Sequence, residues 1–356
     1  MKSTFPPAKI ADIDAGWLNA WLASSGRAPG VQVVSVDRTD NPKWHVADTA
    51  FLSLSCEGDN ADTVPQRLFA KLRTVPDPFA PHFPGEVTFY GWAGRCAKAG
   101  RRVPVPACHL SLNDRRAGTS LIFLDDLRAS HDTLAWGEDP NNRQCLQAVR
   151  ALAAIHATSW VQPATIDTAV VRAREELVHD YVCNKLPPFL DALDGHVAED
   201  VADALADVCR TAHAHKVNRL TSTLPLCAAH GDAHAWNFLY PKDADVRLAA
   251  AIDFESWHVG FPGTDFAAYM ALFWDADRRD RLQIGLLNAY FADLRARGAT
   301  GYGWRDAWND YRLGIACAAS LALFQWDAGH DPSLWTATAK RWHSAFEDLN
   351  CTDVLT

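Results

Sequence analysis

The chain has 356 residues, 48% of them hydrophobic and 22% charged, which favours two lobes with sizeable cores over general disorder. Its formal net charge of −9 argues against a general nucleic-acid or anionic-membrane surface, because both need an excess of lysine and arginine. No signal-peptide core, 18-residue apolar run or feature of an obligate protein partner is present, so we expect a soluble, cytoplasmic protein.

The N-terminal part of the chain is predicted to form a small lobe of strands and helices. A helix capped by Asp12 or Asp14 and ended by Gly26 is expected first, and a second helix is expected at 85–98. The stretch 75–84 contains four prolines, so we expect an irregular connection there. Short β-prone runs predict strands at 31–36, 46–55, 67–72, 107–112 and 120–124.

Beyond residue 126 the pattern changes to long helices. This helical pattern is interrupted by two short apolar runs, 225–229 and 248–252. We therefore predict an α+β, two-lobed fold with a small β-rich N-terminal lobe, 1–126, and a larger, mainly helical C-terminal lobe, 127–356. Helical spacing of apolar residues occurs in the segments 143–160, 168–185, 198–219, 264–275, 280–297, 304–328 and 332–349.

The nine cysteines are scattered, odd in number, and never form a Cys-x-x-Cys pair. Disulfide frameworks and zinc knuckles need regular pairs, so this pattern favours reduced, mostly buried thiols. The cysteines are therefore expected to contribute to packing rather than to cross-links.

Three polar residues lie close together between the two short apolar runs. Asp232 is followed by four residues and then Asn237, and Asp253 comes at the end of the second run. Phosphoryl transfer to an alcohol needs a group that accepts the hydroxyl proton and oxygen ligands that hold Mg²⁺ on the phosphates. The spacing of Asp232 and Asn237 is that of a kinase catalytic loop.

A lysine and a glutamate in the N-terminal lobe fit the same chemistry. Lys71 lies in the predicted strand 67–72, and Glu86 begins the helix that follows. An ion pair between them would orient the lysine toward phosphate oxygens. Taken alone, Lys71 also fits a solvated edge strand, and Glu86 fits the favourable charge of a first helical turn.

These motifs resemble a known group of enzymes. His230-Gly231-Asp232-x-His234-x-x-Asn237, Ile252-Asp253-Phe254-Glu255 and Gly263-Thr264-Asp265 are similar to the aminoglycoside phosphotransferase and choline kinase group. The companion motifs look most like its ecdysteroid-kinase-like (CHK) branch, and the resemblance covers roughly residues 45 to 275. The companion motifs are Leu68-Phe69-Ala70-Lys71-Leu72, Glu86-x-x-Phe89-Tyr90, Leu124-Asp125-Asp126-Leu127 and Leu152-x-x-Ile155-His156-Ala157-x-x-Trp160.

The resemblance implies a protein-kinase-like fold and a small-molecule kinase that uses ATP and Mg²⁺. It implies that Asp232 is the catalytic base, that His230 braces the loop, and that Asn237 and Asp253 bind the metal. The N-terminal lobe would bind the nucleotide, and the C-terminal lobe would carry the catalytic loop and the substrate site.

In the N-terminal lobe, the resemblance implies a set of nucleotide contacts. Lys71 would meet the ATP phosphates with Glu86 as its partner, and the backbone of Asp125, Asp126 and Leu127 would meet adenine. The choice between ATP and GTP stays open.

Two departures from the family pattern bear on this interpretation. The family's phosphate-covering loop usually contains glycine, whereas residues 39–49 contain none. Glu255 stands where protein kinases have the glycine of Asp-Phe-Gly, which argues against a protein substrate.

Two other functions stay open at this stage. A pseudokinase would bind the nucleotide without transferring phosphate, in keeping with the missing glycines. A zinc-dependent hydrolase would use His230, His234 and a further downstream ligand. Metal analysis that finds no zinc in the purified protein would exclude the hydrolase, and phosphorylated product would exclude the pseudokinase.

The acceptor alcohol is not identified by the sequence. An antibiotic, a sterol, an amino alcohol and a sugar all remain open. An aromatic and acidic wall for a bulky or cationic alcohol is one interpretation, and core packing is the other. The main candidates are Glu255, Trp257, Trp274, Asp275 and Trp326, and Trp236 and His258 are further members of such a wall.

Overall fold

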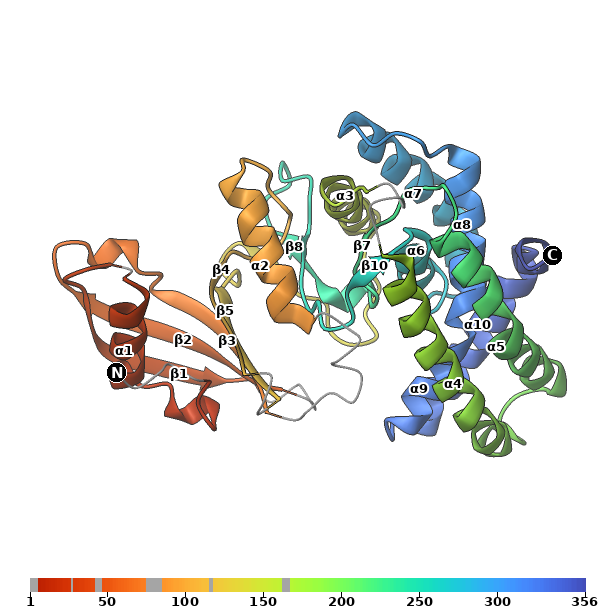
Figure 1. The fold of residues 1–356 in the computed structure, drawn as a ribbon, viewed down its shortest axis with the longest axis horizontal. Helices are drawn as coiled ribbons and strands as arrows, with labels where there is room; N and C mark the ends of the chain where they lie inside the picture. Colours follow the sequence, from red (N-terminus) through yellow and green to blue (C-terminus); the bar gives the residue numbers. More distant parts are fainter. Residues whose placement is uncertain (1–5, 27, 42–46, 75–84, 115–117, 162–166) are drawn as a thin grey trace. The chain divides into compact units, whose positions relative to one another are not determined.

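The structure is a computed structural model, and it divides into two compact units, Met1–His131 and Asp132–Thr356 (Figure 1). It describes residues 6–26, 28–41, 47–74, 85–114, 118–161 and 167–356. The proline-rich connection expected at 75–84 and residues 42–46 of the expected phosphate loop lie outside the described residues.

Unit 1 is built on a five-stranded antiparallel sheet with the order β1-β2-β3-β5-β4. β1 and β5 contain several of the β-branched residues that favour strands, whereas β3 consists mainly of leucine, alanine and basic residues. Strand β3 lies in the middle of the sheet, with β2 on one side and β5 on the other. The strands are β1 (Gln32–Asp40), β2 (Asp48–Glu57), β3 (Arg67–Arg73), β4 (Cys108–Asp114) and β5 (Thr119–Asp125).

Two α-helices accompany this sheet, α1 (Ala15–Ser25) and α2 (Gly85–Lys98). Of the two expected caps for α1, Asp14 is the one used, because its carboxylate accepts a hydrogen bond from the Trp17 amide at 2.7 Å. Gly26 ends the helix in the left-handed conformation, as glycine does most easily. Short 3-10 turns lie at Ile10–Asp12 and Ala61–Thr63.

Unit 2 is mainly helical. Helix α4 continues past its expected end at residue 185, through Pro187 and Pro188, because its apolar face continues with the buried Phe189 and Leu193. The helices are α3 (Asn142–Thr158), α4 (Thr168–Leu193), α5 (Glu199–Leu220), α6 (Gly263–Met270), α7 (Ala276–Ala296), α8 (Trp304–Cys317), α9 (Leu321–Asp327) and α10 (Pro332–Asp348), with 3-10 turns η4 (Ala235–Asn237), η5 (Ala318–Ser320) and η6 (Cys351–Val354).

The helix expected at 304–328 is not continuous. The structure divides it into α8, the turn η5 and α9. A single 3-10 turn hardly disturbs the helical spacing of the apolar residues on either side of it. The periodicity alone therefore did not reveal the division into two helices.

Two short ribbons of strands lie among the helices of unit 2. Strand β7 (Cys227–Ala229) pairs antiparallel with β10 (His258–Gly260), and β8 (Phe238–Pro241) pairs antiparallel with β9 (Ala250–Ala251). A further two-residue strand, β6 (His131–Asp132), lies at the junction of the units. Because β7 precedes Asp232 and β9 precedes Asp253, the ribbons position both aspartates.

Helices α6 and α8 cross with their backbones in contact. A Cβ atom on Gly263 would lie 1.7 Å from the carbonyl oxygen of Asp310, and one on Gly314 would lie 2.1 Å from the carbonyl oxygen of Gly263. Only glycine permits this approach, so the crossing fixes the start of α6, where Asp265 lies. The glycine of the Gly263-Thr264-Asp265 motif is thereby explained.

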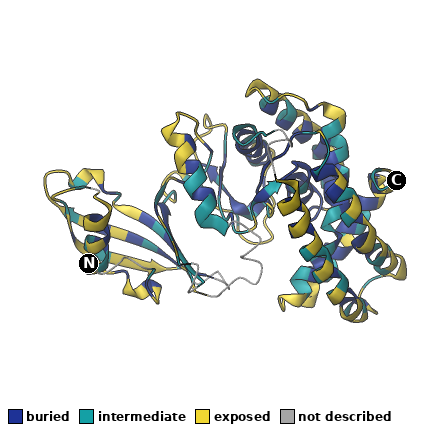
Figure 2. Ribbon diagram, in the orientation of Figure 1, coloured by how far each residue is buried: buried dark blue, intermediate teal, exposed yellow. Residues whose placement is uncertain are grey.

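The distribution of burial follows the amphipathic pattern of the helices. Helices α4 and α5 carry both buried and exposed residues along their length, as Figure 2 shows. Among the helices that the structure describes, none has the length and apolar character to cross a membrane.

Candidate active site

The loop of residues 230–237, here called the aspartate loop, begins directly after β7. Its second residue, Gly231, has a φ of 82°. A Cβ atom there would lie 2.3 Å from the carbonyl oxygen of Ser256. A side chain at this position is therefore excluded both by backbone conformation and by space. The glycine lets the loop pass against the segment that carries Asp253.

Asp265, in the first turn of α6, holds the start of the aspartate loop. Its carboxylate accepts hydrogen bonds from the backbone amides of His230 at 2.8 Å and Gly231 at 2.9 Å. The same carboxylate contacts His156 Nε2 at 2.9 Å and is fully buried. Burial raises the pKa of Asp265, but the hydrogen bonds and charge of His156 and His230 outweigh it and lower the pKa. The loop is thus tied to a buried carboxylate.

His230 joins the aspartate loop to the residue before Asp253. Its Nε2 lies 2.8 Å from the carbonyl oxygen of Ile252, and its Nδ1 accepts the Asp232 amide at 3.3 Å. The carbonyl requires a donor, so the proton of the neutral ring is on Nε2. Both ring nitrogens of His230 are thus occupied by contacts within the protein.

Asp232 is surrounded by donors. Asn237 Nδ2 donates to its backbone oxygen at 2.8 Å and to Oδ2 at 3.2 Å, and His234 Nε2 lies 3.4 Å from Oδ2. Burial raises the pKa of Asp232, but His234, His230 and Asn237 together lower it. The side chain is still 46% exposed. An ionised carboxylate that remains accessible is what a base for a hydroxyl proton requires.

The oxygen of the Asn237 side chain is a buried acceptor without a hydrogen-bond partner among the described residues. Asn237 is 1% exposed, and among the described residues its Oδ1 receives no hydrogen bond. A buried acceptor of this kind needs an explanation, and a bound metal ion supplies one. The other amide atom, Nδ2, is already used to hold Asp232, so the orientation of Oδ1 is fixed.

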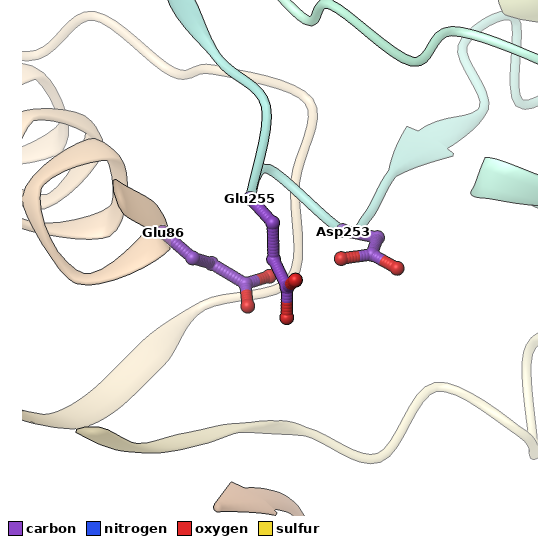
Figure 3. A group of neighbouring side chains, drawn as sticks. All are labelled: Glu86, Asp253 and Glu255. Atoms are coloured by element: carbon purple, nitrogen blue, oxygen red, sulfur yellow. The ribbon is translucent and has the colours of Figure 1, made fainter. Parts of the chain in front are cut away.

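Two carboxylates extend the set of oxygen donors. Asp253 follows β9, and Figure 3 shows its side chain with that of Glu255 from the same segment, whereas Glu86 comes from α2. Carboxylate oxygens of Asp253 and Glu255 lie within 4.8 Å of each other. An amide oxygen and carboxylates suit a hard cation such as Mg²⁺, so the residues present fit this metal.

In unit 1 the structure brings Lys71 and Glu86 together. Lys71 Nζ lies 2.9 Å from Glu86 Oε2, and each side chain is 10% exposed. Lys71 is on the central strand β3, opposite Thr49 in β2 and Ile122 in β5. It is therefore not a solvated edge lysine, and its charge is held in place by a carboxylate.

Asp125 and Asp126 at the end of β5 have partners within unit 1. Asp125 contacts His109 at 2.6 Å. The Asp126 side chain is 1% exposed and contacts Arg67 at 2.7 Å and Arg128 at 2.8 Å. Burial raises the pKa of Asp126, but hydrogen bonds from the two arginines lower it to about 2. These side chains are committed to protein contacts, so any adenine contact belongs to the backbone of 125–127.

Three of the five expected substrate residues have contacts that explain them without a substrate. Trp274 is 2% exposed and packs edge-on against Tyr269, with ring centroids 5.6 Å apart. Asp275 caps α7 by accepting the Arg278 amide at 2.7 Å. Trp326 packs on Phe189 of α4, with ring centroids 5.8 Å apart. Glu255 and the half-buried Trp257 remain beside Asp253 along the chain.

An aromatic cluster lies beside Asp232, and of its members only Trp236 was a candidate from the sequence. Trp136 and Trp236 have ring centroids 4.4 Å apart, and His234 lies 5.4 Å from Trp236 and 5.5 Å from Phe273. Trp136 is 64% exposed. No local pattern joins residues so far apart in the chain, so only the fold reveals the cluster.

Together, the N-terminal sheet with its lysine–glutamate pair and the helical unit with its aspartate loop define a small-molecule kinase of the protein-kinase-like fold. The family follows from the sequence itself. Residues 58–308 match the phosphotransferase enzyme family (APH), and the chain belongs to that family. The chain is therefore an enzyme that transfers a phosphoryl group to a hydroxyl. The narrower resemblance to the CHK branch stays a prediction.

Solved structures confirm the expected fold. The choline kinase of Cryptosporidium parvum Iowa II has a TM-score of 0.57 and 10% identity, over 90% of this chain and 91% of that one. A microcompartment-associated aminopropanol kinase has a TM-score of 0.54 and 13% identity, over 90% of this chain and 94% of that one. Aminoglycoside 2'-phosphotransferase-IIIa, in its GDP complex, has a TM-score of 0.52 and 11% identity, over 94% of this chain and 99% of that one. No curated protein is matched by the sequence.

Proposed function

We propose that this enzyme transfers the γ-phosphate of ATP to a hydroxyl of a small molecule, with Mg²⁺. The observation that carries the proposal is the pairing of Asp232 with Asn237, whose second amide atom is a buried oxygen without a partner among the described residues. A carboxylate beside a metal ligand is the arrangement that phosphoryl transfer to an alcohol needs.

In this proposal the protein groups divide the work. Asp232 accepts the proton of the acceptor hydroxyl. At the same time the hydroxyl oxygen bonds to the γ-phosphorus, and the bond between the γ-phosphorus and the oxygen of ADP breaks. Asn237 and Asp253 hold Mg²⁺, which when bound neutralises charge on the phosphates. Lys71, held by Glu86 at 2.9 Å, contacts phosphate oxygens. The backbone of residues 125–127 contacts the base.

The bracing contacts support the role of Asp232. His230 and Asp265 are fully buried and fix the loop from two sides. A base that is held in position spends no energy on reorganisation when the reaction occurs. We therefore assign His230 a positioning role rather than a chemical step.

For the acceptor we propose an alcohol with an apolar or aromatic body. The ring faces of Trp136, Trp236 and Phe273 gather around His234, which lies beside Asp232. An exposed tryptophan on such a cluster offers a flat surface on which a substrate can stack. Glu255 and Trp257 stay in the proposal as nearby contacts.

The test replaces Asp232. In Asp232→Ala, we expect turnover to fall by about 10²-fold to 10⁴-fold while the affinity for Mg-ATP stays nearly unchanged, because a base acts in the transition state. The release of ADP or GDP would be measured with ATP or GTP as phosphoryl donor and a library of hydroxyl compounds as acceptors. Asp245→Asn, an exposed aspartate between β8 and β9, is the matched control and should keep full turnover.

Unchanged turnover in Asp232→Ala would exclude Asp232 as the base. If the wild-type protein binds Mg-ATP but phosphorylates no acceptor in a broad library, the pseudokinase interpretation replaces the proposal. Product formed with GTP alone would correct the nucleotide and leave the roles of the residues standing.

A further inference from the structure

Residues 253–257, here called the acidic turn, connect β9 to β10. The residue before the turn, Ile252, donates its amide N–H to the carbonyl oxygen of Asn237 at 3.0 Å, and its own carbonyl oxygen accepts from His230 Nε2 at 2.8 Å. Both partners lie in the aspartate loop, so the start of the acidic turn is fixed to that loop. The position of Asp253, the proposed metal ligand, therefore depends on what holds the other end of the turn.

The other end of the acidic turn is held by His258, the first residue of β10. Its Nδ1 lies 3.0 Å from the carbonyl oxygen of Ser256, which belongs to the turn. The same carbonyl oxygen would lie 2.3 Å from a Cβ atom on Gly231. His258 thus holds the peptide group against which the aspartate loop passes.

The ring of His258 has a fixed position on β10. His258 pairs with Ala229 in β7, and only 9% of the residue is exposed. Residues two apart in a strand lie on the same face, and a Cβ atom on Gly260 would lie 2.9 Å from His258 Nε2. The ring therefore lies across Gly260, where a side chain would displace it. The burial of His258 argues against the substrate contact that the sequence left open for it.

Burial and neighbouring charges keep the His258 ring neutral. Glu175 on α4 contacts Lys216 on α5 at 2.6 Å and accepts from Arg174 Nε at 2.9 Å, and Arg174 also donates to a carbonyl oxygen of β10 at 3.3 Å. Burial lowers the pKa of His258 to about 4, and the charges of Arg174 and Lys216 act in the same direction, against that of Glu175. A carbonyl oxygen requires a donor, so the proton of the neutral ring is on Nδ1.

We propose that His258 is a positioning residue for the acidic turn, whose Nδ1–H holds the Ser256 carbonyl and, through it, the backbone that carries Asp253. His258 acts through the turn and not on the substrate. It lies between the motifs 252–255 and 263–265 and belongs to neither. The inference rests on the function proposed above, because it deepens the role given there to Asp253.

Two amide side chains separate the Nδ1 donor of His258 from the bulk of its ring. The nitrogen of an asparagine side chain is bonded to Cγ, as Nδ1 of histidine is, whereas the nitrogen of glutamine lies one atom further along, as Nε2 does. His258→Asn therefore keeps a donor for the Ser256 carbonyl, and His258→Gln moves the donor away from it. His330→Gln is the matched control, because His330 is exposed between α9 and α10.

The first measurement uses the full-length protein without metal or nucleotide. We expect His258→Gln to speed amide hydrogen exchange in peptides that contain residues 253–257 by about 3-fold to 10-fold, which corresponds to the loss of one hydrogen bond. His258→Asn and His330→Gln should exchange there as the wild type does. Exchange in α10 should be the same in all four proteins, which separates a change in the acidic turn from general destabilisation.

The second measurement titrates Mg²⁺ into protein saturated with ATP and follows thermal unfolding. We expect His258→Gln to raise the Mg²⁺ concentration for half-maximal stabilisation by about 10-fold to 100-fold, because partners that orient a metal ligand typically change metal affinity by this factor. The affinity for ATP without Mg²⁺ should stay unchanged, and His258→Asn should restore the Mg²⁺ response. Gly260→Ala, which displaces the ring, should act in the same direction as His258→Gln.

Wild-type exchange and a wild-type Mg²⁺ response in His258→Gln would overturn the inference. Equal losses in His258→Asn and His258→Gln would also overturn it, because the bulk of the ring and not its Nδ1 donor would then hold the turn. If His258→Gln fails to fold, Gly260→Ala decides, and wild-type behaviour of that variant rejects the inference. A wild-type protein that shows no Mg²⁺-dependent stabilisation contradicts the proposed function instead, and the exchange measurement still decides the role of His258.

Discussion

At the scale of single residues, Gly231 shows how tightly the aspartate loop is held. Its φ of 82° favours glycine, and the carbonyl oxygen of Ser256 would lie 2.3 Å from a Cβ atom. The loop on the other side of this contact carries Asp253. A single methyl group would therefore push apart the two segments that bear the proposed base and metal ligand.

We expect Gly231→Ala to destabilise the protein by about 1–3 kcal/mol and to lower turnover, because it adds backbone strain and a clash. Gly285→Ala is the matched control: Gly285 lies in α7 with nothing within 4 Å of a Cβ atom, so alanine should stabilise by about 0.5–1 kcal/mol. Denaturant unfolding and steady-state kinetics measure both. Equal stability of the two variants would contradict the steric argument.

The residues that were predicted well are those whose relation is local. Asp232 and Asn237 are five positions apart, so their spacing in the sequence nearly fixes their contact. The support given by Asp265 depends on the α6 crossing, and the cluster around Trp136 depends on chain reversals far apart in the sequence. Neither leaves a periodic signal. The roles of the site residues stay predictions until variants are measured.

At the scale of elements, Asp126 connects parts of the unit 1 sheet. It follows β5 and binds Arg67 at the start of β3, and Arg128, whose guanidinium lies 3.4 Å from the Phe51 ring centroid in β2. The buried carboxylate thus links three strands. Its ionisation should contribute to the stability of the sheet.

This contribution depends on pH. Hydrogen bonds lower the pKa of Asp126 from 3.8 to about 2. The stabilising contribution of Asp126 is therefore fully present above the unfolded pKa and is lost as the pH falls from about 4 to about 2. We expect the stability difference between wild type and Asp126→Asn to shrink over that window, as measured by denaturant unfolding. In the background Arg67→Ala/Arg128→Ala this pH dependence should shrink or reverse, because the burial that raises the pKa of Asp126 remains. A difference that is constant with pH would contradict the assignment.

The elements themselves were largely predictable, and their boundaries less so. Apolar periodicity located the helices, but it did not reveal the turn η5 or the passage of α4 through two prolines. Burial of Phe189 and Leu193 outweighs the local cost of those prolines. Tertiary packing decides such cases, and a single sequence does not contain it explicitly.

At the scale of the whole molecule, ligand binding should stabilise the fold by mass action. Mg-ATP at about 100 times its dissociation constant should raise the free energy of unfolding by about 2.7 kcal/mol. We expect most of this effect to vanish when Mg²⁺ is left out, and in Asp253→Asn, since Asp253 is a proposed ligand of the ion. Thermal unfolding with and without nucleotide measures this stabilisation. If Mg-ATP stabilised Asp253→Asn as fully as the wild type, Asp253 would be excluded as a ligand of the ion.

The fold class was predictable because the change from strands to helices runs through the whole chain. The stacking of His179 on His213 was not, because it joins residues on two different helices and leaves no signal along the chain.

The backbone of Asp253 has a consequence for how this enzyme can change over time. Its φ is 65°, a conformation that glycine, asparagine and aspartate enter readily and other residues avoid. Of these three, only aspartate carries a charge. A one-base codon change to asparagine or glycine would remove that charge and keep the chain's path. A duplicated gene copy could thus lose the proposed metal ligand in one step and keep its fold.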